Sequence, residues 1–167
     1  MEQAASASIP VTADPLPDRS TLEELIYRSC LLLDEKNFTG FLELCDEEFH
    51  YTITTYSPEI RKDMVWLDHD RGGMTTLLQQ LPRHNSDHSP ITRHATVYTV
   101  SYDATRQATV VSALQVFKTA LEGGVTELFA VGKYVDTVSV KGGKPLLLRR
   151  VVKLDTRMLG IGYHIPF

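Results

Sequence analysis

The sequence lacks several features that would mark a secreted or membrane protein. It has only two cysteines, Cys30 and Cys45, and both lie in apolar helical patterns, so we expect buried free thiols rather than a disulfide. No apolar run approaches the roughly 20 residues that a membrane-spanning helix needs. The N-terminus has no basic start followed by an apolar stretch, so a secretory signal is not expected. These absences predict a cytoplasmic protein that crosses no membrane.

An excess of charge of one sign is also missing. The 167 residues include 17 Lys or Arg and 21 Asp or Glu, which gives a formal net charge of −4. Acidic and basic residues are interspersed, and no basic stripe is present, so nucleic acid is not an expected partner. A chain of this length has room for one domain.

Cofactor and metal motifs are absent as well. A Rieske cluster needs paired Cys and His ligands from two short loops, and a mononuclear iron site needs two His and a carboxylate. Two isolated cysteines cannot supply the first. His84 and His88, with Asp87 between them, follow Pro82, which should end a helix; we therefore expect a polar loop rather than a metal site. No nucleophile elbow or phosphate-binding loop occurs.

The N-terminal half predicts helices. Residues 1–19 lack periodicity and contain three prolines, so we expect a mobile arm, or one that docks on a neighbouring subunit. Ser20–Glu23 reads as a capping box that begins a helix reaching about Glu35. A second helix is expected at residues 37–45.

The middle of the chain predicts one strand and one further helix. Residues 48–54 alternate as a strand does, and residues 55–69 are expected to be irregular. Apolar residues at helical spacing predict a helix over residues 70–81 that Pro82 ends. Residues 83–92 should form a loop.

The C-terminal half predicts a sheet. Four strands are expected at residues 94–102, 107–119, 125–138 and 145–155, and their short, turn-rich connections favour an antiparallel meander. The segment 108–117 is apolar on both faces, so its second face needs cover, such as another subunit. We therefore predict an α+β fold in which residues 20–167 form one curled, antiparallel-rich mixed sheet with helices packed on one face.

Acid–base catalysis needs few residues and is harder to exclude. If the chain is a stand-alone enzyme of this fold, its candidate acid–base residues are His50, His94 and Asp136. Alternatively, the chain could be a small-ligand-binding or interaction domain. Arg150 interrupts an apolar strand, so it should be paired if it is buried. An ion pair with Asp136 or Glu127 is the simpler expectation, and substrate binding is the alternative.

The C-terminus is apolar to its last residue. Exposed chain ends are usually polar and frayed, whereas residues 158–167 are rich in apolar side chains. We expect this tail either to pack on its own sheet or to lie in an interface.

Several segments resemble the small (β) subunits of aromatic-ring-hydroxylating dioxygenases, and the resemblance covers about residues 20–167. The most specific segments are Glu127–Asp136 and Leu148–Val152. The others are Leu31–Asp34, Phe49–Tyr51 and Arg93–His94. None of them is a catalytic motif, so the resemblance is one of pattern and not of chemistry.

The resemblance implies a fold and a role. These subunits share the cone fold of ketosteroid isomerase and scytalone dehydratase, which is nuclear transport factor 2-like. In that family the large (α) subunit holds the Rieske 2Fe–2S cluster and a mononuclear iron. The resemblance therefore implies a non-catalytic assembly subunit without a cofactor of its own. It also implies self-association as a trimer, in a complex of three large and three small subunits.

The resemblance also suggests a substrate. Tyr56–Met64, Trp66–Asp70 and the loop Pro82–Pro90 look closer to the methanesulfonate monooxygenase small subunit than to benzene-type members. This likeness implies a complex that hydroxylates a small alkylsulfonate, with cleavage to an aldehyde and sulfite, using electrons from a reductase and a ferredoxin. Aromatic acids such as benzoate or phthalate are the alternative substrates.

Overall fold

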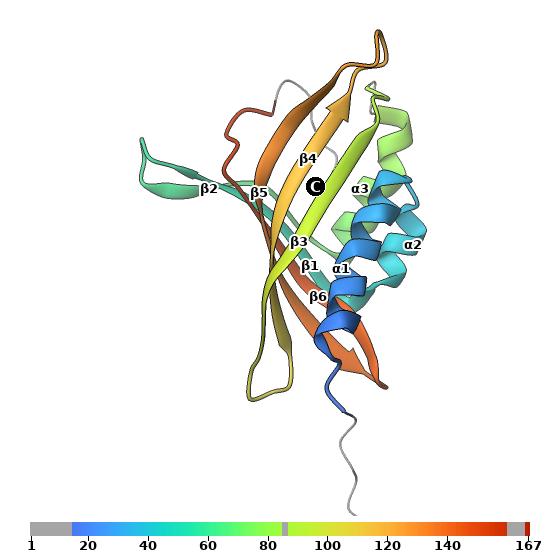
Figure 1. Ribbon diagram of the computed structural model, residues 1–167, viewed down its shortest axis with the longest axis vertical. Helices are drawn as coiled ribbons and strands as arrows, with labels where there is room; N and C mark the ends of the chain where they lie inside the picture. The colour runs from blue at the N-terminus through green and yellow to red at the C-terminus, as the bar shows by residue number, and fades with distance from the viewer. Residues whose placement is uncertain (1–14, 85–86, 160–165) are drawn as a thin grey trace, which may run out of the picture.

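A curled six-stranded sheet forms the body of the protein in the computed structural model, which describes residues 15–84, 87–159 and 166–167 (Figure 1). The strands lie in the order β2-β1-β6-β5-β4-β3. Neighbours are antiparallel except β1 and β6, which run parallel. The strands are β1 (Cys45–Ser57), β2 (Lys62–Asp70), β3 (Ile91–Tyr102), β4 (Ala108–Thr119), β5 (Thr126–Lys141) and β6 (Lys144–Leu154). The predicted meander of the last four strands is confirmed.

The helices of the described residues gather on one face of this sheet, as Figure 1 shows. They are α1 (Arg19–Asp34), α2 (Phe38–Glu43) and α3 (Arg71–His84). The apolar stripe of α1, which includes Leu22, Ile26 and Leu33, is buried in the common core with side chains from all the long strands. The α+β fold with a mixed sheet and helices on one face is therefore confirmed.

Strand β4 shows how the sheet divides its two faces. Alternate residues from Ala108 to Val116 are buried in the core, as the period of a strand requires. The intervening residues, among them Val111, Ala113 and Phe117, are only half-buried. Apolar side chains thus remain partly exposed on the face that the helices do not cover. This is the second apolar face that the sequence predicts.

The first helix begins earlier than predicted. Its N-cap is Asp18, whose carboxylate accepts a hydrogen bond from the Thr21 backbone N–H at 2.8 Å. Ser20 lies inside the helix, and its hydroxyl donates to Asp18, so the predicted capping box at Ser20 is wrong. Asp and Ser are both good N-caps, and the aspartate two residues earlier is the N-cap. Residues 1–14 of the predicted arm lie outside the described residues.

The segment predicted to be irregular, residues 55–69, contains a strand. β2 pairs with β1 in an antiparallel hairpin, with Thr54 opposite Val65 and Tyr56 opposite Asp63. The sequence conceals this strand because its side chains are mostly exposed, so no apolar alternation marks a buried face. Backbone pairing with β1 holds it instead.

The third helix does not stop at Pro82 but continues to His84. A proline near the end of a helix removes one backbone hydrogen bond, and its fixed φ is itself helical, so a short continuation is tolerated. The following strand also begins earlier than predicted, at Ile91. Within the described ranges, no helix is both long and apolar enough to span a membrane.

Candidate functional site

The interior of the cone contains a buried ion pair. Asp136 on β5 and Arg150 on β6 are register partners, and the guanidinium donates two hydrogen bonds to the carboxylate, at 2.8 and 3.0 Å. Both side chains are fully buried. The predicted ion pair is confirmed, and of the two candidate partners it is Asp136 that pairs with Arg150.

Burial and charge act against each other in this pair. Burial raises the pKa of the Asp136 carboxyl, and the Arg150 guanidinium partly offsets that rise. Burial alone would lower the pKa of Arg150, but the charge of Asp136 holds it above its ordinary value. The guanidinium also lies 4.0 Å from the centre of the Tyr134 ring, a cation–π contact. Arg150 therefore remains charged inside the core.

A second buried arginine, Arg93, lies at the start of β3. It forms an ion pair with Asp34 at the end of α1, with 2.5 Å between Nη1 and Oδ1. Asp34 also accepts the Arg93 backbone N–H, and Arg93 Nη2 donates to the Pro166 carbonyl at 2.5 Å. Arg93 thus joins the first helix, the sheet and the last residues of the sequence.

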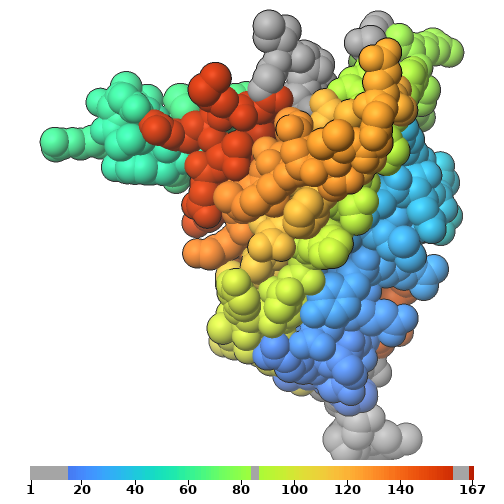
Figure 2. Space-filling view, turned by 45° about the horizontal axis from the view of Figure 1, so that its top comes forward, coloured from blue at the N-terminus to red at the C-terminus, as the bar shows by residue number. Residues whose placement is uncertain are grey.

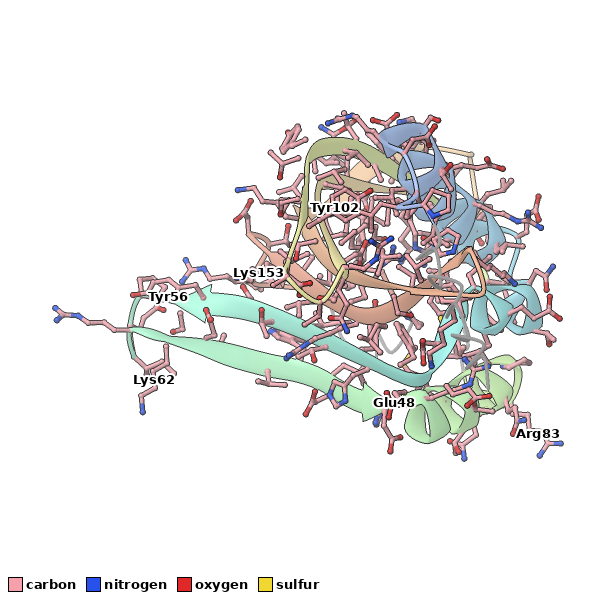
Figure 3. All side chains as sticks on the ribbon, turned by 90° about the horizontal axis from the view of Figure 1, so that it is seen from below. Glu48, Tyr56, Lys62, Arg83, Tyr102 and Lys153 are labelled. Atoms are coloured by element: carbon pink, nitrogen blue, oxygen red, sulfur yellow. The ribbon has the colours of Figure 1, made fainter. Side chains whose placement is uncertain are left out.

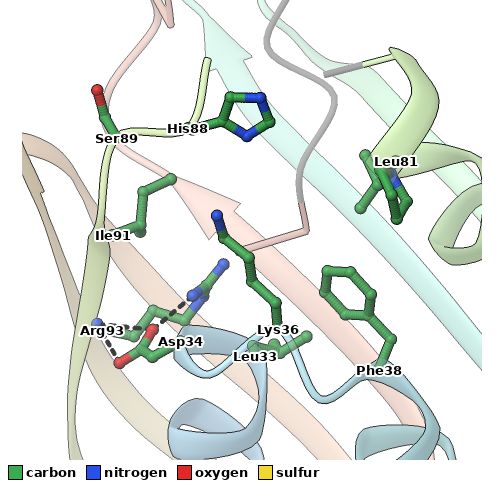
Figure 4. Close-up of a pocket in the computed structure, with 10 residues that line it drawn as sticks. Leu33, Asp34, Lys36, Phe38, Leu81, His88, Ser89, Ile91 and Arg93 are labelled. Carbon is green, nitrogen blue, oxygen red and sulfur yellow. Dashed lines mark hydrogen bonds and ion pairs between the residues drawn. The ribbon is translucent and has the colours of Figure 1, made fainter. Parts of the chain in front are cut away.

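A cavity of about 230 Å³ lies beside Arg93, between the ends of α1 and α3 and the start of β3 (Figure 4). Figure 4 shows Phe38 and Leu81 on one side of it and Ile91 and His88 on the other, with Lys36 extending between them. This volume lies below the roughly 300–1,000 Å³ that is usual for ligand pockets. The buried Asp136 and Arg150 do not line it.

The three residues that a stand-alone enzyme would use do not come together. His50 lies on β1 with its ring partly exposed and 2.7 Å from Asp68 on β2. His94 lies on the opposite edge strand, β3, against the ring of Phe117. Three strands separate β1 from β3, and Asp136 is buried in the core between them. One substrate cannot contact all three.

The His84–His88 region offers no metal site in the parts that can be described. The side chain of His84 and residues 85–86 lie outside the described residues, and His88 is exposed beside the cavity. Asp87 pairs with Lys118 of β4 at 2.5 Å, which ties this loop to the sheet. Among the described residues, no group of three or more His, Cys, Asp or Glu could hold a metal ion.

The two cysteines are free and buried, as predicted. Burial raises the pKa of Cys45 to about 12 and also raises that of Cys30. A Rieske cluster needs two Cys and two His ligands close together, and among the described residues no group of three or more His, Cys, Asp or Glu could hold a metal ion. The donors described here therefore do not fit a Rieske cluster.

The exterior carries large apolar side chains that are exposed in the described part of the chain. Strands β1 and β2 extend as a two-stranded hairpin away from the body, and Figure 3 places Tyr56 and Lys62 near its far end. We call residues 54–67 the hairpin arm. Its exposed apolar residues are Tyr56, Ile60, Val65 (61% exposed) and Trp66 (43% exposed).

The hairpin arm is anchored rather than loose. Glu59, in its turn, accepts a hydrogen bond from Arg157, at 2.7 Å, in the segment that follows β6. Figure 2 shows this segment, in red, against the base of the arm. A hydrogen bond from its own backbone, and then bonds from Ser57 and Arg157, lower the pKa of Glu59 to about 2. This exposed ion pair links the turn of the arm to the segment that follows β6.

Two further apolar patches lie elsewhere on the surface. One joins α1 to the edge strand β3 and consists of Tyr27, Leu31 and Tyr98. The other lies at the connection of β4 and β5 and consists of Leu121, Val125 and Leu128. Exposed aromatic and aliphatic residues in contiguous patches are typical of protein interfaces.

Sequence reasoning missed two features of the site. It did not predict the ion pair of Arg93 with Asp34, nor the contact of Tyr51 with the last residue, Phe167. Arg93 and Asp34 did stand within segments that carry the family pattern, but nothing in a single sequence says that they meet. The apolar tail was the one signal for the second contact; most of that tail, residues 160–165, lies outside the described residues.

Comparison with known proteins agrees with this picture. A family model described as "Ring hydroxylating beta subunit" matches residues 28–160. The β subunit of methanesulfonate monooxygenase hydroxylase from Methylosulfonomonas methylovora is 40% identical over 164 residues, which cover 92% of this chain and 91% of the relative. The β subunit of 2-aminobenzenesulfonate 2,3-dioxygenase from Alcaligenes sp. is 34% identical over 149 residues, covering 89% and 99%.

Solved structures agree on the fold. A β subunit from Novosphingobium aromaticivorans, assigned to an aromatic-ring-hydroxylating dioxygenase, superposes with a TM-score of 0.74 at 19% identity, covering 89% of this chain and 96% of its own. An NTF2-like protein from the same species gives 0.63 at 18% identity, with 90% of each chain covered. These likenesses confirm the predicted cone fold. Together with the sequence matches, they show that this chain belongs to the ring-hydroxylating β-subunit family, the small subunits of multicomponent oxygenases.

Proposed function

We propose that this chain is the assembly subunit of a multicomponent oxygenase and has no active site of its own. In this proposal it binds a large (α) subunit, which carries a Rieske 2Fe–2S cluster and a mononuclear iron. The observation that carries the proposal is the contrast between interior and exterior. Arg150, Tyr51 and Tyr134 fill the cone and are fully buried, whereas the hairpin arm exposes Val65 and Trp66.

The burial of the interior charged side chains argues against catalysis by this chain alone. A catalytic acid or base must reach its substrate, within hydrogen-bond distance. Asp136, the carboxylate whose pKa burial raises, has no exposed surface and is held by Arg150. Its environment fits a structural ion pair.

The exposed surfaces suggest where other subunits bind. Three exposed apolar surfaces lie on different elements of the fold: the hairpin arm, the patch on α1 and β3, and the patch at the connection of β4 and β5. They can therefore bind more than one neighbouring subunit. We propose that they mediate contact with the large subunit and with other copies of this chain, in a complex of three large and three small subunits. Aromatic residues such as Trp66 and Tyr98 are the residue types that contribute most at interfaces.

The relatives suggest the substrate class of the complex. One is named for methanesulfonate and the other for 2-aminobenzenesulfonate, and both compounds carry a sulfonate group. We therefore propose that the complex hydroxylates a sulfonate, with a small alkylsulfonate as the first candidate. Aromatic carboxylic acids such as benzoate and phthalate are the alternative.

Oxygen uptake by purified components tests the proposal. This chain and its cognate large subunit are co-expressed and purified, and uptake is measured with a reductase and ferredoxin. Methanesulfonate, 2-aminobenzenesulfonate, benzoate and phthalate serve as substrates. We expect sulfonate-dependent uptake by the complex and none by this chain alone. Uptake with the carboxylic acids only would contradict the substrate class, and turnover by this chain alone would contradict the assembly role.

A further inference from the structure

The last residue of the sequence lies inside the cone. Phe167 is fully buried, although most chain ends are exposed and frayed. Its ring stacks on Phe129 of β5, with 6.3 Å between the ring centres and 19° between the planes. Aromatic ligands in protein pockets make the same kind of ring-stacking contact. Here the ring belongs to the chain itself.

Polar groups hold the backbone of the same two residues. The Tyr51 hydroxyl donates to the main-chain oxygen of Phe167 and accepts from the Phe167 N–H, both at 2.9 Å. Arg93 Nη2 donates to the Pro166 carbonyl at 2.5 Å. Tyr51 and Arg93 are themselves buried, so three hydrogen bonds fix the tail in a dry environment, where each is hard to replace by water.

The groups that receive the tail come from distant parts of the fold. Tyr51 lies on β1, Phe129 on β5 and Arg93 on β3. Tyr51 is also the register partner of Arg150 on β6, so the tail reaches the strands that carry the buried ion pair. The receiving groups thus form a site within the cone and do not belong to a local turn.

From these contacts we infer that the cone interior is a binding site for a phenyl ring joined to a peptide-like carbonyl, and that Pro166 and Phe167 occupy it as an intramolecular ligand. The site has an aromatic wall in Phe129, a donor and acceptor in Tyr51, and a cationic donor in Arg93. Its ligand class is a peptide that contains Pro-Phe. This inference does not depend on the proposed assembly role.

Removing the occupant tests the site. A variant that lacks Pro166 and Phe167 loses one large buried side chain and the hydrogen bonds to Tyr51 and Arg93, and its melting temperature should fall by about 10 °C. N-acetyl-prolyl-phenylalanine is then titrated into this variant and into the full chain. We expect the peptide to bind the shortened chain, to restore part of the lost melting temperature, and not to bind the full chain, whose site is filled.

Two controls separate specific binding from general loss of packing. N-acetyl-prolyl-alanine lacks the ring and should not restore stability. The variant Met158→Ala removes an apolar side chain that is 87% exposed in the same terminal segment, and it should leave the melting temperature unchanged. An unchanged melting temperature in the shortened chain, equal effects of the two peptides, or binding of the peptide to the full chain would each overturn the inference.

The Tyr51→Phe variant provides an independent readout. In the full chain it should lower the melting temperature by about 4 °C, since it removes the hydroxyl that contacts Phe167. In the shortened chain its effect should be smaller, because the contact with Phe167 is already absent. The same decrease in both backgrounds would contradict the inference. If the shortened chain does not fold, the variant Phe167→Leu replaces it in the test. This variant should have a lower melting temperature than the full chain and should bind no peptide. An unchanged melting temperature would overturn the inference.

These readouts use this chain alone. A chain that fails the peptide test but still forms an active complex with the large subunit would overturn the internal site and leave the assembly proposal standing.

Discussion

Arg150 and Asp136 face each other across β5 and β6 with no exposed surface on either side chain. The arginine uses Nε and Nη2 for the carboxylate, while its Nη1 has no hydrogen-bond partner among the described residues. A buried pair of this kind is costly to break and contributes less than its Coulomb energy suggests, because both charges were taken out of water.

Breaking this pair from one side should be severe. Asp136→Asn leaves the Arg150 charge buried without its counter-charge, and it should lower the free energy of unfolding by about 3–5 kcal/mol. The double variant Asp136→Leu with Arg150→Met removes both charges and should recover most of that loss. Urea denaturation of the three proteins measures the difference. If the double variant were less stable than Asp136→Asn, the ion pair would contribute more to stability than the avoidance of an unpaired buried charge.

Asp46 should make stability depend on acid pH. Although its burial raises the pKa, hydrogen bonds from Ser139 at 2.6 Å and from Lys141 at 2.9 Å outweigh it, so the pKa falls from 3.8 to about 2. A carboxyl whose pKa is lowered on folding stabilises the protein above its unfolded pKa, and this contribution is lost as the pH falls from about 4 to about 2. At neutral pH the contribution is roughly 2 kcal/mol.

The variant Asp46→Asn checks this origin of the pH dependence. It should be less stable than the parent chain at pH 6, and the difference should shrink below pH 3, where the parent carboxyl is also protonated. Chemical denaturation at several pH values gives both curves. A constant difference from pH 6 to pH 2 would mean that the ionised carboxylate is not the stabilising species.

The hairpin arm should matter for assembly and not for folding. Trp66→Glu places a charge on an exposed apolar position, and exposed substitutions usually change stability by less than about 0.5 kcal/mol. Co-purification with the large subunit, or self-association, should nevertheless weaken by at least about tenfold, because a charge would have to be buried in the interface. Size-exclusion chromatography with light scattering detects the loss. Gln80→Glu, exposed on α3, is the matched control and should assemble normally.

The cysteines should be protected in the folded chain. Both are buried, and burial raises the pKa of each thiol, so little of the reactive thiolate exists at neutral pH. Neither should react with a thiol reagent until the protein unfolds, and both should then react together. Absorbance during labelling in native buffer and in urea measures this. Rapid labelling of one thiol in native buffer would indicate a local opening of the core.

The sequence was most informative where burial creates a pattern. The apolar stripe of α1 and the alternation in β4 both correspond to faces that pack in the core. Arg150 was predicted to be paired because a lone charge in an apolar strand is too costly. Its partner Asp136 stood nearby on the adjacent strand, within a family segment.

The sequence was least informative where the structure depends on backbone pairing or on contacts between residues far apart in the sequence. β2 was missed because it is exposed and is held by hydrogen bonds to β1, which leave no side-chain pattern. Tyr51 and Phe167 are 116 residues apart, so their contact depends on how the sheet curls and not on any local sequence. The start of α1 was misplaced because Asp18 and Ser20 are both good caps and their choice depends on local geometry.

The mass of the intact complex tests the central claim most directly. This chain is co-expressed with its cognate large subunit, and native mass spectrometry measures the purified assembly. The account predicts one species that contains three copies of each chain, with iron carried only by the large subunit once the subunits are separated. Recovery of this chain as a free monomer, with the large subunit fully assembled and active without it, would contradict the account.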